Sequence, residues 1–202
     1  MPTGWLALLK HLQRTGQRVD GLRRICVGGA ACPAYIVDAF GEDYGVEVFH
    51  AWGMTEMSPV GTYNQLKAGM ESLPPADLAK LRLRQGRGLL GGEMKITDDE
   101  SRELPWDGKA FGALKVRGPW VCSHYFGEDQ PATDTDGWFD TGDVATIDAA
   151  GYMLITDRSK DVIKSGGEWI SSIELENTAV NHPAVAEAAV IGRPHPQWGE
   201  RP

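Results

Sequence analysis

Residues 151–177, GYMLITDRSKDVIKSGGEWISSIELEN, constrain this chain more than any other stretch. A hydrophobic run leads into a charged turn at 157–161. An apolar pair, the dipeptide Gly166-Gly167 and a helix start follow, and paired glycines are typical of a hairpin turn. An apolar core needs neither a cationic turn nor a glycine hairpin so close together. A site that grips an anionic ligand and then moves needs both.

The composition and net charge limit the classes of binding partner that this chain can have. The 202 residues are 42% hydrophobic, enough for one domain with a sizeable core, or one domain and part of another. The formal net charge of −8 argues against a nucleic-acid partner, because phosphate backbones need a basic face. The same charge is compatible with a soluble cytoplasmic enzyme. An anionic ligand would then require locally concentrated cations or magnesium.

Cysteine usage and the N-terminal segment exclude other classes. Cys26, Cys32 and Cys122 form an odd set without a CxxC spacing, so neither a disulfide framework nor a zinc site is expected, and we interpret them as small buried thiols. Residues 1–17 have the pattern of an amphipathic helix with basic residues, not of a signal peptide. The sequence contains no apolar run near the roughly 18 residues that span a bilayer.

Hydrophobic periodicity predicts a mixed α/β (α+β) chain without internal repeats. Composition shifts at 157–161, where we place a domain boundary. Ser171 and Glu174 have the spacing of a helix capping box. The predicted elements are helices at 4–16, 33–40 (ending at Gly41), 77–84 and 171–182 (ending at His182-Pro183), and strands at 23–27, 46–50, 93–97, 113–118, 137–148, 152–156 and 185–191.

The segment 50–62, HAWGMTEMSPVGT, follows a predicted strand. Trp52 can present a flat ring, and Gly53 lets backbone approach a ligand without a Cβ in the way. Thr55 offers a hydroxyl to a phosphate oxygen, and Glu56 offers an oxygen suited to magnesium. Composition alone favours a plainer interpretation, a strand-end turn with a buried Trp and a surface Glu.

Two further turns carry candidate residues. The segment 27–33, VGGAACP, connects a strand to a helix, and by itself indicates a tight turn. The segment 137–148 places Asp143 behind a Thr-Gly pair at a turn, where a carboxylate can accept hydrogen bonds from two vicinal hydroxyls or stabilise the turn itself.

Together these strings resemble the adenylate-forming superfamily of acyl-CoA synthetases, firefly luciferase and peptide-synthetase adenylation domains, and most of all the bacterial medium- and long-chain fatty-acyl-CoA synthetases. The resemblance implies that the nucleotide-binding residues are Gly28, Gly29, Ala30, Trp52, Gly53, Met54, Thr55, Asp143 and Arg158. It places the Trp52 ring against adenine, where Tyr is commoner, Asp143 and Arg158 on the ribose, and Glu56 on Mg²⁺.

The resemblance also assigns the junction. Lys160 matches the hinge about which the small domain rotates between adenylation and thioester formation, and with Thr55 and Glu56 it completes the implied catalytic set. Ser165, Gly166, Gly167 and Trp169 match a loop beside which the CoA pantetheine slides, and Lys164 and Glu168 flank it. Trp5 matches an aromatic residue near the acyl tunnel, although a core or surface Trp is the simpler interpretation.

The implied architecture is the C-terminal half of a large AMP-binding domain (1–157) with mixed sheets and a small β-barrel-like subdomain, a hinge (158–161) and the start of a small α+β domain (162–202). The family's pyrophosphate-binding loop and C-terminal lysine have no match here. We therefore expect a fragment that is inactive, or nearly so, alone.

The implied activity is ATP-dependent formation of an acyl-adenylate from a fatty acid or similar carboxylate, followed by thioester formation with CoA, in the cytoplasm. The cofactors and substrates would be ATP/AMP, Mg²⁺ and CoA, with no nucleic acid and no transmembrane segment; peripheral membrane contact and a homodimer stay open. The alternatives are an adenylation domain that loads a carrier protein, and a non-catalytic nucleotide-binding or scaffolding remnant.

Two other patterns are set aside. The string 86–91 spells G-x-G-x-x-G, but a dinucleotide fingerprint needs a strand before it and a helix after it, whereas a basic helix precedes and a strand follows. The five histidines are scattered and do not form a ligand pattern.

Overall fold

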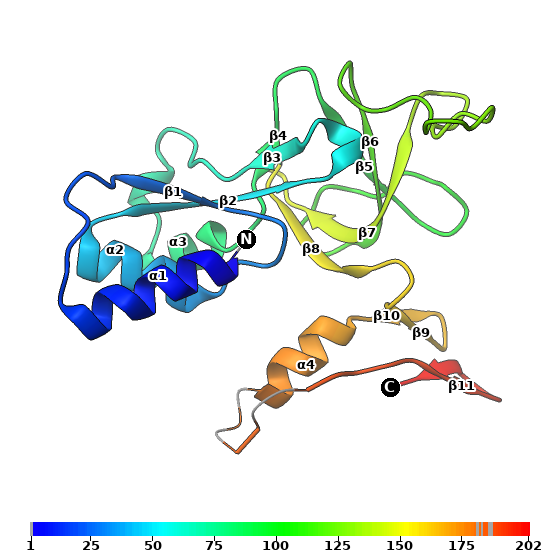
Figure 1. The fold of residues 1–202 in the computed structure, drawn as a ribbon. Helices are drawn as coiled ribbons and strands as arrows, with labels where there is room; N and C mark the ends of the chain where they lie inside the picture. Colours follow the sequence, from blue (N-terminus) through cyan, green and yellow to red (C-terminus); the bar gives the residue numbers. More distant parts are fainter. Residues whose placement is uncertain (1, 181, 183, 186–187) are drawn as a thin grey trace.

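The computed structural model describes residues 2–180, 182, 184–185 and 188–202. Three four-stranded sheets succeed one another along the chain, in the orders β1-β2-β3-β4, β5-β6-β7-β8 and β10-β9-β12-β11. Figure 1 shows the first two sheets side by side, with the third sheet and α4 forming a separate lobe beneath them. The mixed α/β prediction is confirmed.

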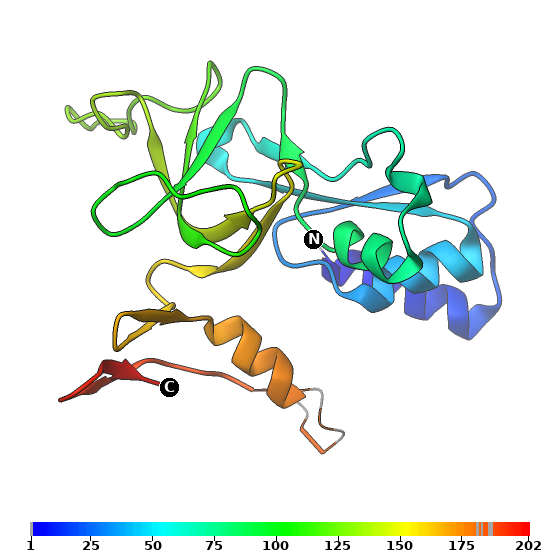
Figure 2. The ribbon, with the colours of Figure 1, turned by 180° about the vertical axis from the view of Figure 1, so that it is seen from behind.

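The first sheet is mixed and carries the helices on one face. The parallel strands β1 (Arg24–Val27) and β2 (Glu47–Gly53) pair first, and β3 (Val60–Tyr63) and β4 (Arg87–Gly88) add antiparallel pairs. Helix α2 (Ala34–Tyr44) supplies the crossover between the parallel strands, and α1 (Pro2–Thr15) packs beside it (Figure 1). Viewed from behind, α3 (Pro75–Arg82) lies on the same side of the sheet (Figure 2).

An apolar cluster joins these helices to the sheet. Its centre is Leu9 of α1, Val27 of β1, and Ile36 and Phe40 of α2, each fully buried. Trp5 packs on this cluster edge-on to Phe40, and its indole N–H donates to the Cys26 carbonyl at 3.0 Å. The simpler interpretation of Trp5, a packing residue, matches these contacts.

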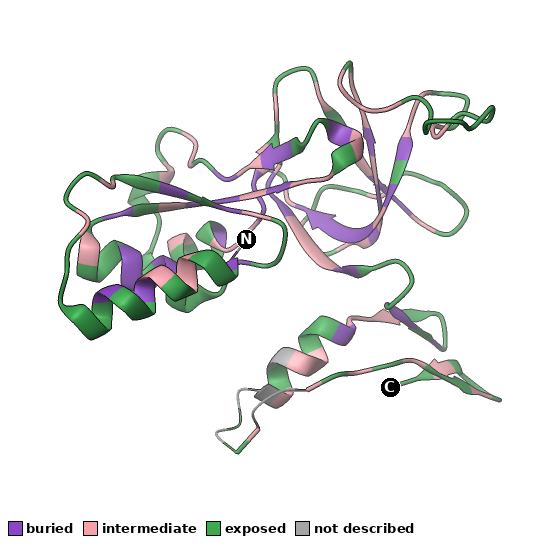
Figure 3. Cartoon of the chain, viewed as in Figure 1, coloured by how far each residue is buried: buried purple, intermediate pink, exposed green. Residues whose placement is uncertain are grey.

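The second sheet is an antiparallel meander of β5 (Glu93–Thr97), β6 (Phe111–Arg117), β7 (Phe139–Ile147) and β8 (Met153–Arg158). Alternating residues of β6 are buried, as period-2 patterning requires when one face is covered. In the described part of the chain this sheet stays open, so it forms no closed barrel. Figure 3 shows buried residues concentrated in these strands and exposed residues in the loops.

Backbone bonds join the first sheet to the second. Gly86 forms an antiparallel bridge with Met153 at the start of β8, and the Gln85 side-chain oxygen accepts from the Ile155 N–H at 2.8 Å. A Cβ on Gly86 would lie 2.2 Å from the Tyr63 carbonyl carbon, so the close approach requires glycine. This glycine opens the G-x-G-x-x-G string, which is therefore a sheet junction.

The small lobe begins after β8. It contains the hairpin of β9 (Ile163–Ser165) and β10 (Glu168–Ile170), helix α4 (Ser172–Val180), and the strands β11 (Arg193–His195) and β12 (Gly199–Arg201). Gly166 and Gly167 both have positive φ, 61° and 87°, so the predicted glycine hairpin is confirmed.

Several predicted boundaries were wrong. Helix α2 runs through Gly41 and ends at Gly45, whose φ of 65° gives the left-handed cap that the backbone bonds require. Helix α3 covers Pro75–Arg82, two residues earlier than predicted at each end, and β2 continues to Gly53. Asp143 lies within β7 and not at a turn.

In the small lobe, α4 ends at Val180. The predicted helix end at Pro183 lies outside the described residues. The predicted strand at 185–191 is absent from its described residues, 185 and 188–191, and the remainder lies outside them.

The cysteine prediction was correct for one residue of three. Cys32 is buried, and burial raises the pKa of its thiol to about 11. Cys26 is exposed and Cys122 is partly buried.

Two leucines provide a matched test of the second sheet. Leu114 in β6 is fully buried and Leu90 is 99% exposed. Leu114→Ala should lower the free energy of unfolding by about 2–5 kcal/mol, because it removes buried methyl groups and leaves a cavity. Leu90→Ala should change it by less than about 0.5 kcal/mol. Urea denaturation measures both, and equal effects would contradict the packing described here.

Candidate functional site

The parallel pair β1–β2 places the first two motifs together. Val27 pairs with His50, so both strands reach their carboxyl ends at the same sheet edge, where ligands bind in open α/β sheets. The Gly28-Gly29-Ala30 turn leaves β1 there, and 51–56 continue from β2. A Cβ on Gly28 would lie 3.0 Å from the Ala51 carbonyl oxygen, which brings the two segments into contact.

His50 ties this edge to the helical layer. It is 2% exposed, and its Nδ1 lies 2.9 Å from the Leu83 carbonyl oxygen. Burial lowers the pKa of its imidazole, and hydrogen bonds to the Leu83 and Ala30 backbone partly offset that effect. The histidine is thus a satisfied buried residue beside the turn.

Gly53 is required by the chain itself. A Cβ there would lie 1.8 Å from the Pro59 carbonyl oxygen, because β3 folds back across β2 at this point. The segment Thr55–Met57 forms a short 3-10 turn between these strands, with Thr55 exposed and Glu56 partly exposed. The sequence analysis explained the glycine at position 53 differently, as leaving room for a ligand.

Tyr125 is a neighbour of Glu56 that the sequence argument missed. Its hydroxyl donates to Glu56 Oε1 at 2.9 Å, and the Cys122 N–H donates to the Glu56 carbonyl at 2.8 Å. No spacing rule connects residues 69 positions apart. The described residues contain no cluster of three His, Cys, Asp or Glu that could hold a metal. A single carboxylate fits Mg²⁺ bound mainly by phosphates and water, so Glu56 is compatible with that ion.

Asp143 joins both sheets. Its Oδ2 accepts from the Trp52 Nε1–H at 2.9 Å, and its Oδ1 lies 3.0 Å from the Arg158 Nε. Asp143 and Arg158 are paired in the β7–β8 register, so 15 residues of sequence separation become a direct cross-strand contact. The three side chains that the sequence analysis assigned to one nucleotide therefore meet.

The Asp143 carboxylate is almost enclosed. The residue is 3% exposed, and burial is the largest influence on its pKa, which it raises. The Trp52 hydrogen bond and the Arg158 charge act in the opposite direction and favour the ionised form. A buried carboxylate needs donors of this kind, and with two of them Asp143 is a candidate for ligand binding.

The junction residues lie around a second hollow. Arg158 and Lys160 line a cavity of about 440 Å³ between β8 and α4, together with Asp157 and Glu176. Lys160 is exposed in the turn that follows β8. Buried Asp157 accepts from the Ser172 N–H at 2.6 Å and from the Ser172 hydroxyl at 3.2 Å, so a strand residue caps the first turn of α4.

Half of the predicted capping box is present. The Ser171 hydroxyl lies 3.1 Å from the Glu174 N–H, and it also donates to the Thr156 carbonyl at 2.7 Å. The sequence analysis placed Asp157 in the charged turn and did not predict its capping role.

The glycine hairpin lies against the second sheet. Lys164 Nζ is 2.6 Å from Asp99 Oδ1 and 4.5 Å from the centre of the Trp169 ring, and Trp169 meets Phe111 of β6 edge-on. Gly166 lies under the Trp198 ring, where a Cβ would come within 2.7 Å. Trp198 thus packs on Gly166, whereas a Cβ on Gly167 would meet no atom within 4 Å. Gly167 and Glu168 border a cavity of about 700 Å³ that the 98–102 loop also lines.

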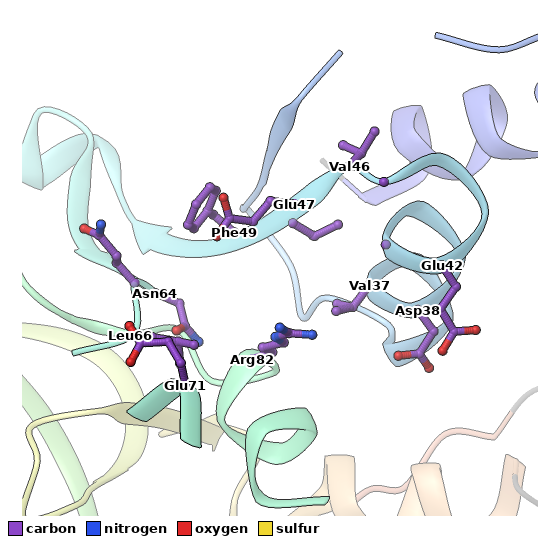
Figure 4. Close-up of a pocket in the computed structure, with 14 residues that line it drawn as sticks. Val37, Asp38, Glu42, Val46, Glu47, Phe49, Asn64, Leu66, Glu71 and Arg82 are labelled. Atoms are coloured by element: carbon purple, nitrogen blue, oxygen red, sulfur yellow. The ribbon is translucent and has the colours of Figure 1, made fainter. Parts of the chain in front are cut away.

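A further cavity is lined mainly by acidic residues among its charged groups. It has a volume of about 660 Å³ between α2, β2 and α3, and Figure 4 shows Asp38, Glu42, Glu47 and Glu71 around it with Arg82 the single labelled cation. Four carboxylates against one guanidinium repel phosphate. None of the predicted site residues lines it.

The family assignment follows from sequence. Residues 1–126 match the model of the AMP-binding enzyme family, and residues 174–202 match its AMP-binding enzyme C-terminal domain. The chain belongs to the AMP-binding enzyme family. The division into domains at 157 and 162 and the hinge remain predictions.

Similar proteins agree with that assignment. The chain is 55% identical to a 3-methylmercaptopropionyl-CoA ligase of Ruegeria lacuscaerulensis. The match covers the whole of this chain and 38% of the length of that relative. It is 51% identical to a medium-chain-fatty-acid–CoA ligase of Ectopseudomonas oleovorans, again over its whole length and 37% of the relative. The AMP-binding chain thus spans little more than a third of these relatives.

Solved structures share the fold. The o-succinylbenzoate CoA synthetase of Bacillus subtilis, in complex with its acyl-adenylate intermediate, superposes with a TM-score of 0.77 at 30% identity, over 98% of this chain and 38% of that one. ATP-bound MatB of Rhodopseudomonas palustris gives the same TM-score, identity and shares of the two chains. No helix among the described residues is long and apolar enough to cross a membrane.

The Asp157 cap provides a test at the junction. Asp157→Ala should lower the free energy of unfolding by about 1–3 kcal/mol, because buried donors of α4 lose their acceptor. Asp161→Ala, in the turn that follows β8 and exposed, should cost less than about 0.5 kcal/mol. Hydrogen exchange should locate the loss in α4. Unchanged α4 protection in Asp157→Ala would refute the capping role.

Proposed function

We propose that the protein carrying this chain is an AMP-forming acyl-CoA ligase that acts on a fatty acid or a similar aliphatic carboxylate. The observation that carries the proposal is the meeting of Trp52, Asp143 and Arg158 at the carboxyl ends of parallel strands. The names of two relatives support it, since one is called a medium-chain-fatty-acid–CoA ligase and the other a 3-methylmercaptopropionyl-CoA ligase.

The reaction has two steps. The carboxylate attacks the α-phosphorus of ATP and releases pyrophosphate, which leaves an acyl-adenylate. The CoA thiol then attacks the acyl carbon, a C–S bond forms, the C–O bond to AMP breaks and the thiol proton passes to solvent. Mg²⁺ bound to Glu56 would neutralise phosphate charge in the first step.

This chain's own residues hold the nucleotide. The Asp143 carboxylate accepts hydrogen bonds from the two ribose hydroxyls, and the Arg158 guanidinium reaches the same ribose and the phosphate. The Gly28-Gly29-Ala30 backbone borders the adenine, against which the Trp52 ring stacks. Thr55 donates its hydroxyl to a phosphate oxygen, and Met54 lies between these contacts in the motif.

The small lobe provides the residues that border CoA in the second step, thioester formation. Residues 162–202 rotate about Lys160, and the Ser165–Gly167 hairpin with Trp169 then borders the pantetheine arm. In the orientation described here, Asp157 and Thr156 hold α4 through Ser172 and Ser171. Rotation about Lys160 must exchange these bonds, because they connect residues on opposite sides of it.

Removal of the ribose contact tests the nucleotide site. In the whole protein, Asp143→Ala should raise the KM for ATP at least tenfold, since two hydrogen bonds to a charged acceptor are worth about 1.5–3 kcal/mol each. Asp136→Ala, an exposed neighbour before β7, serves as the control and should leave the KM for ATP within about twofold. Unchanged ATP kinetics in Asp143→Ala would remove the assignment.

Calorimetry separates the proposed ligase from its rivals. A ligase should bind a stable acyl-adenylate mimic more tightly than AMP, because the acyl group adds contacts, whereas a non-catalytic remnant should show no such preference. Turnover with free CoA excludes an obligatory carrier protein. A substrate panel of 3-methylmercaptopropionate, octanoate and palmitate then orders the chain lengths, and failure with all three would reject an aliphatic substrate.

A further inference from the structure

The Asp143 carboxylate has both of its oxygens engaged by protein donors. The Trp52 indole N–H occupies one acceptor position on Oδ2, and the Arg158 guanidinium occupies one on Oδ1. An ionised carboxylate offers about four acceptor positions. Two positions therefore remain, one on each oxygen, which is the number that a vicinal diol uses.

The two donors differ in how firmly they are held. The Trp52 residue is 9% exposed and packs with Met57 of the 3-10 turn and Gly61 of β3, where a Cβ would lie 2.6 Å from the Trp52 Cζ3. The Arg158 side chain is 58% exposed. An ion pair with an exposed partner contributes little and exchanges readily. Trp52 is thus the fixed partner of the carboxylate, and Arg158 is the one that can yield to an incoming ligand.

We propose that Trp52 is a positioning residue whose indole N–H orients the Asp143 carboxylate toward the vicinal hydroxyls of a ribonucleotide. This role is additional to stacking against a base, and it rests on the proposed function. Gly61 contributes to this positioning, because only a residue without a side chain leaves room for the Trp52 indole there. Phe at position 52 would keep a ring but lose the donor.

The arrangement has a consequence for pH. The charged groups that face Asp143 are Arg158 across the sheet and Asp140 on its own strand, with Trp52 as the neutral donor. Loss of the Trp52 bond should raise the Asp143 pKa, since a donor to the ionised form disappears. Diol binding needs the carboxylate ionised, so it is present above the pKa and lost below it. The acid limb of binding should therefore move to higher pH.

The experiment compares two ligands that differ only in the diol, AMP and 2′,3′-dideoxy-AMP, by calorimetry on the whole protein. The wild type should prefer AMP at least tenfold. Trp52→Phe should reduce this preference by at least about fivefold and shift its acid limb upward, because affinity for AMP falls more than affinity for the dideoxy ligand. Trp106→Phe, an exposed Trp, is the control and should keep the wild-type preference.

The outcomes separate the two proposals. A Trp52→Phe protein that retains the full preference, or that loses affinity equally for both ligands, overturns the positioning role and leaves the nucleotide site intact. A wild type that binds neither ligand overturns the proposed function together with this inference.

A second measurement covers a Trp52→Phe protein that fails to fold. In the wild type, the Trp52 indole proton resonance should titrate with Asp143, and in Asp143→Asn it should move upfield and lose its titration. An indole resonance that is insensitive to both pH and Asp143→Asn would overturn the positioning role.

Discussion

The buried charge of Asp143 is the constraint on which the arrangement of the large lobe depends. A carboxylate that is 3% exposed requires partners, because an unpaired buried charge is far costlier than a satisfied one. Its partners come from β2 of the first sheet and β8 of the second, so satisfying one charge fixes two sheets against each other. The same enclosure holds the carboxylate in a fixed position near the carboxyl ends of β1 and β2, as a preorganised acceptor would be.

A second polar contact plays the corresponding role at the junction. Asp157 ends the large lobe and caps the first helix of the small one. Hydrogen bonds across a boundary are exchangeable in a way that apolar packing is not, since water or another donor can replace each partner. The Lys164–Asp99 ion pair is exposed, unlike the buried Asp157 cap, and it can be exchanged too. The small lobe is therefore attached in this orientation by polar contacts together with the edge-on contact of Trp169 with Phe111, whereas the cores of the first two sheets are apolar.

Much of the fold could be predicted from the sequence, because its strands are short, alternating and separated by glycine turns. The four strands between residues 93 and 158 and the Gly166-Gly167 hairpin were predicted for that reason, whereas the antiparallel order of those strands comes from the structure. The end of α2 was missed because Gly41 is tolerated inside the helix, and only the left-handed geometry at Gly45 identifies the cap. Asp143 was expected at a turn because Thr-Gly-Asp is a turn-like string, yet tertiary pairing holds it in β7.

The candidate site was predictable only as far as the motifs reach. Trp52, Asp143 and Arg158 were named from strings of residues, but their mutual contacts depend on a register that a sequence does not contain. Tyr125 and Asp99 lie in loops without a periodic signal, and nothing local connects them to Glu56 and Lys164. The reason for Gly53 likewise belongs to the β2–β3 crossing. Partners across loops of this length are set by packing alone.

Charge distribution reconciles an acidic chain with an anionic ligand. The net charge is −8, and the cavity beside α2 gathers carboxylates, so phosphate is repelled from that face. Arg158, Lys160 and Lys164 lie within seven positions of one another at the junction. Screening limits the reach of each charge to about 8–10 Å at physiological ionic strength, so the charges near a site, more than the net charge, would govern an anionic ligand there. At the junction, the Arg158 guanidinium meets the buried carboxylate of Asp143 at 3.0 Å.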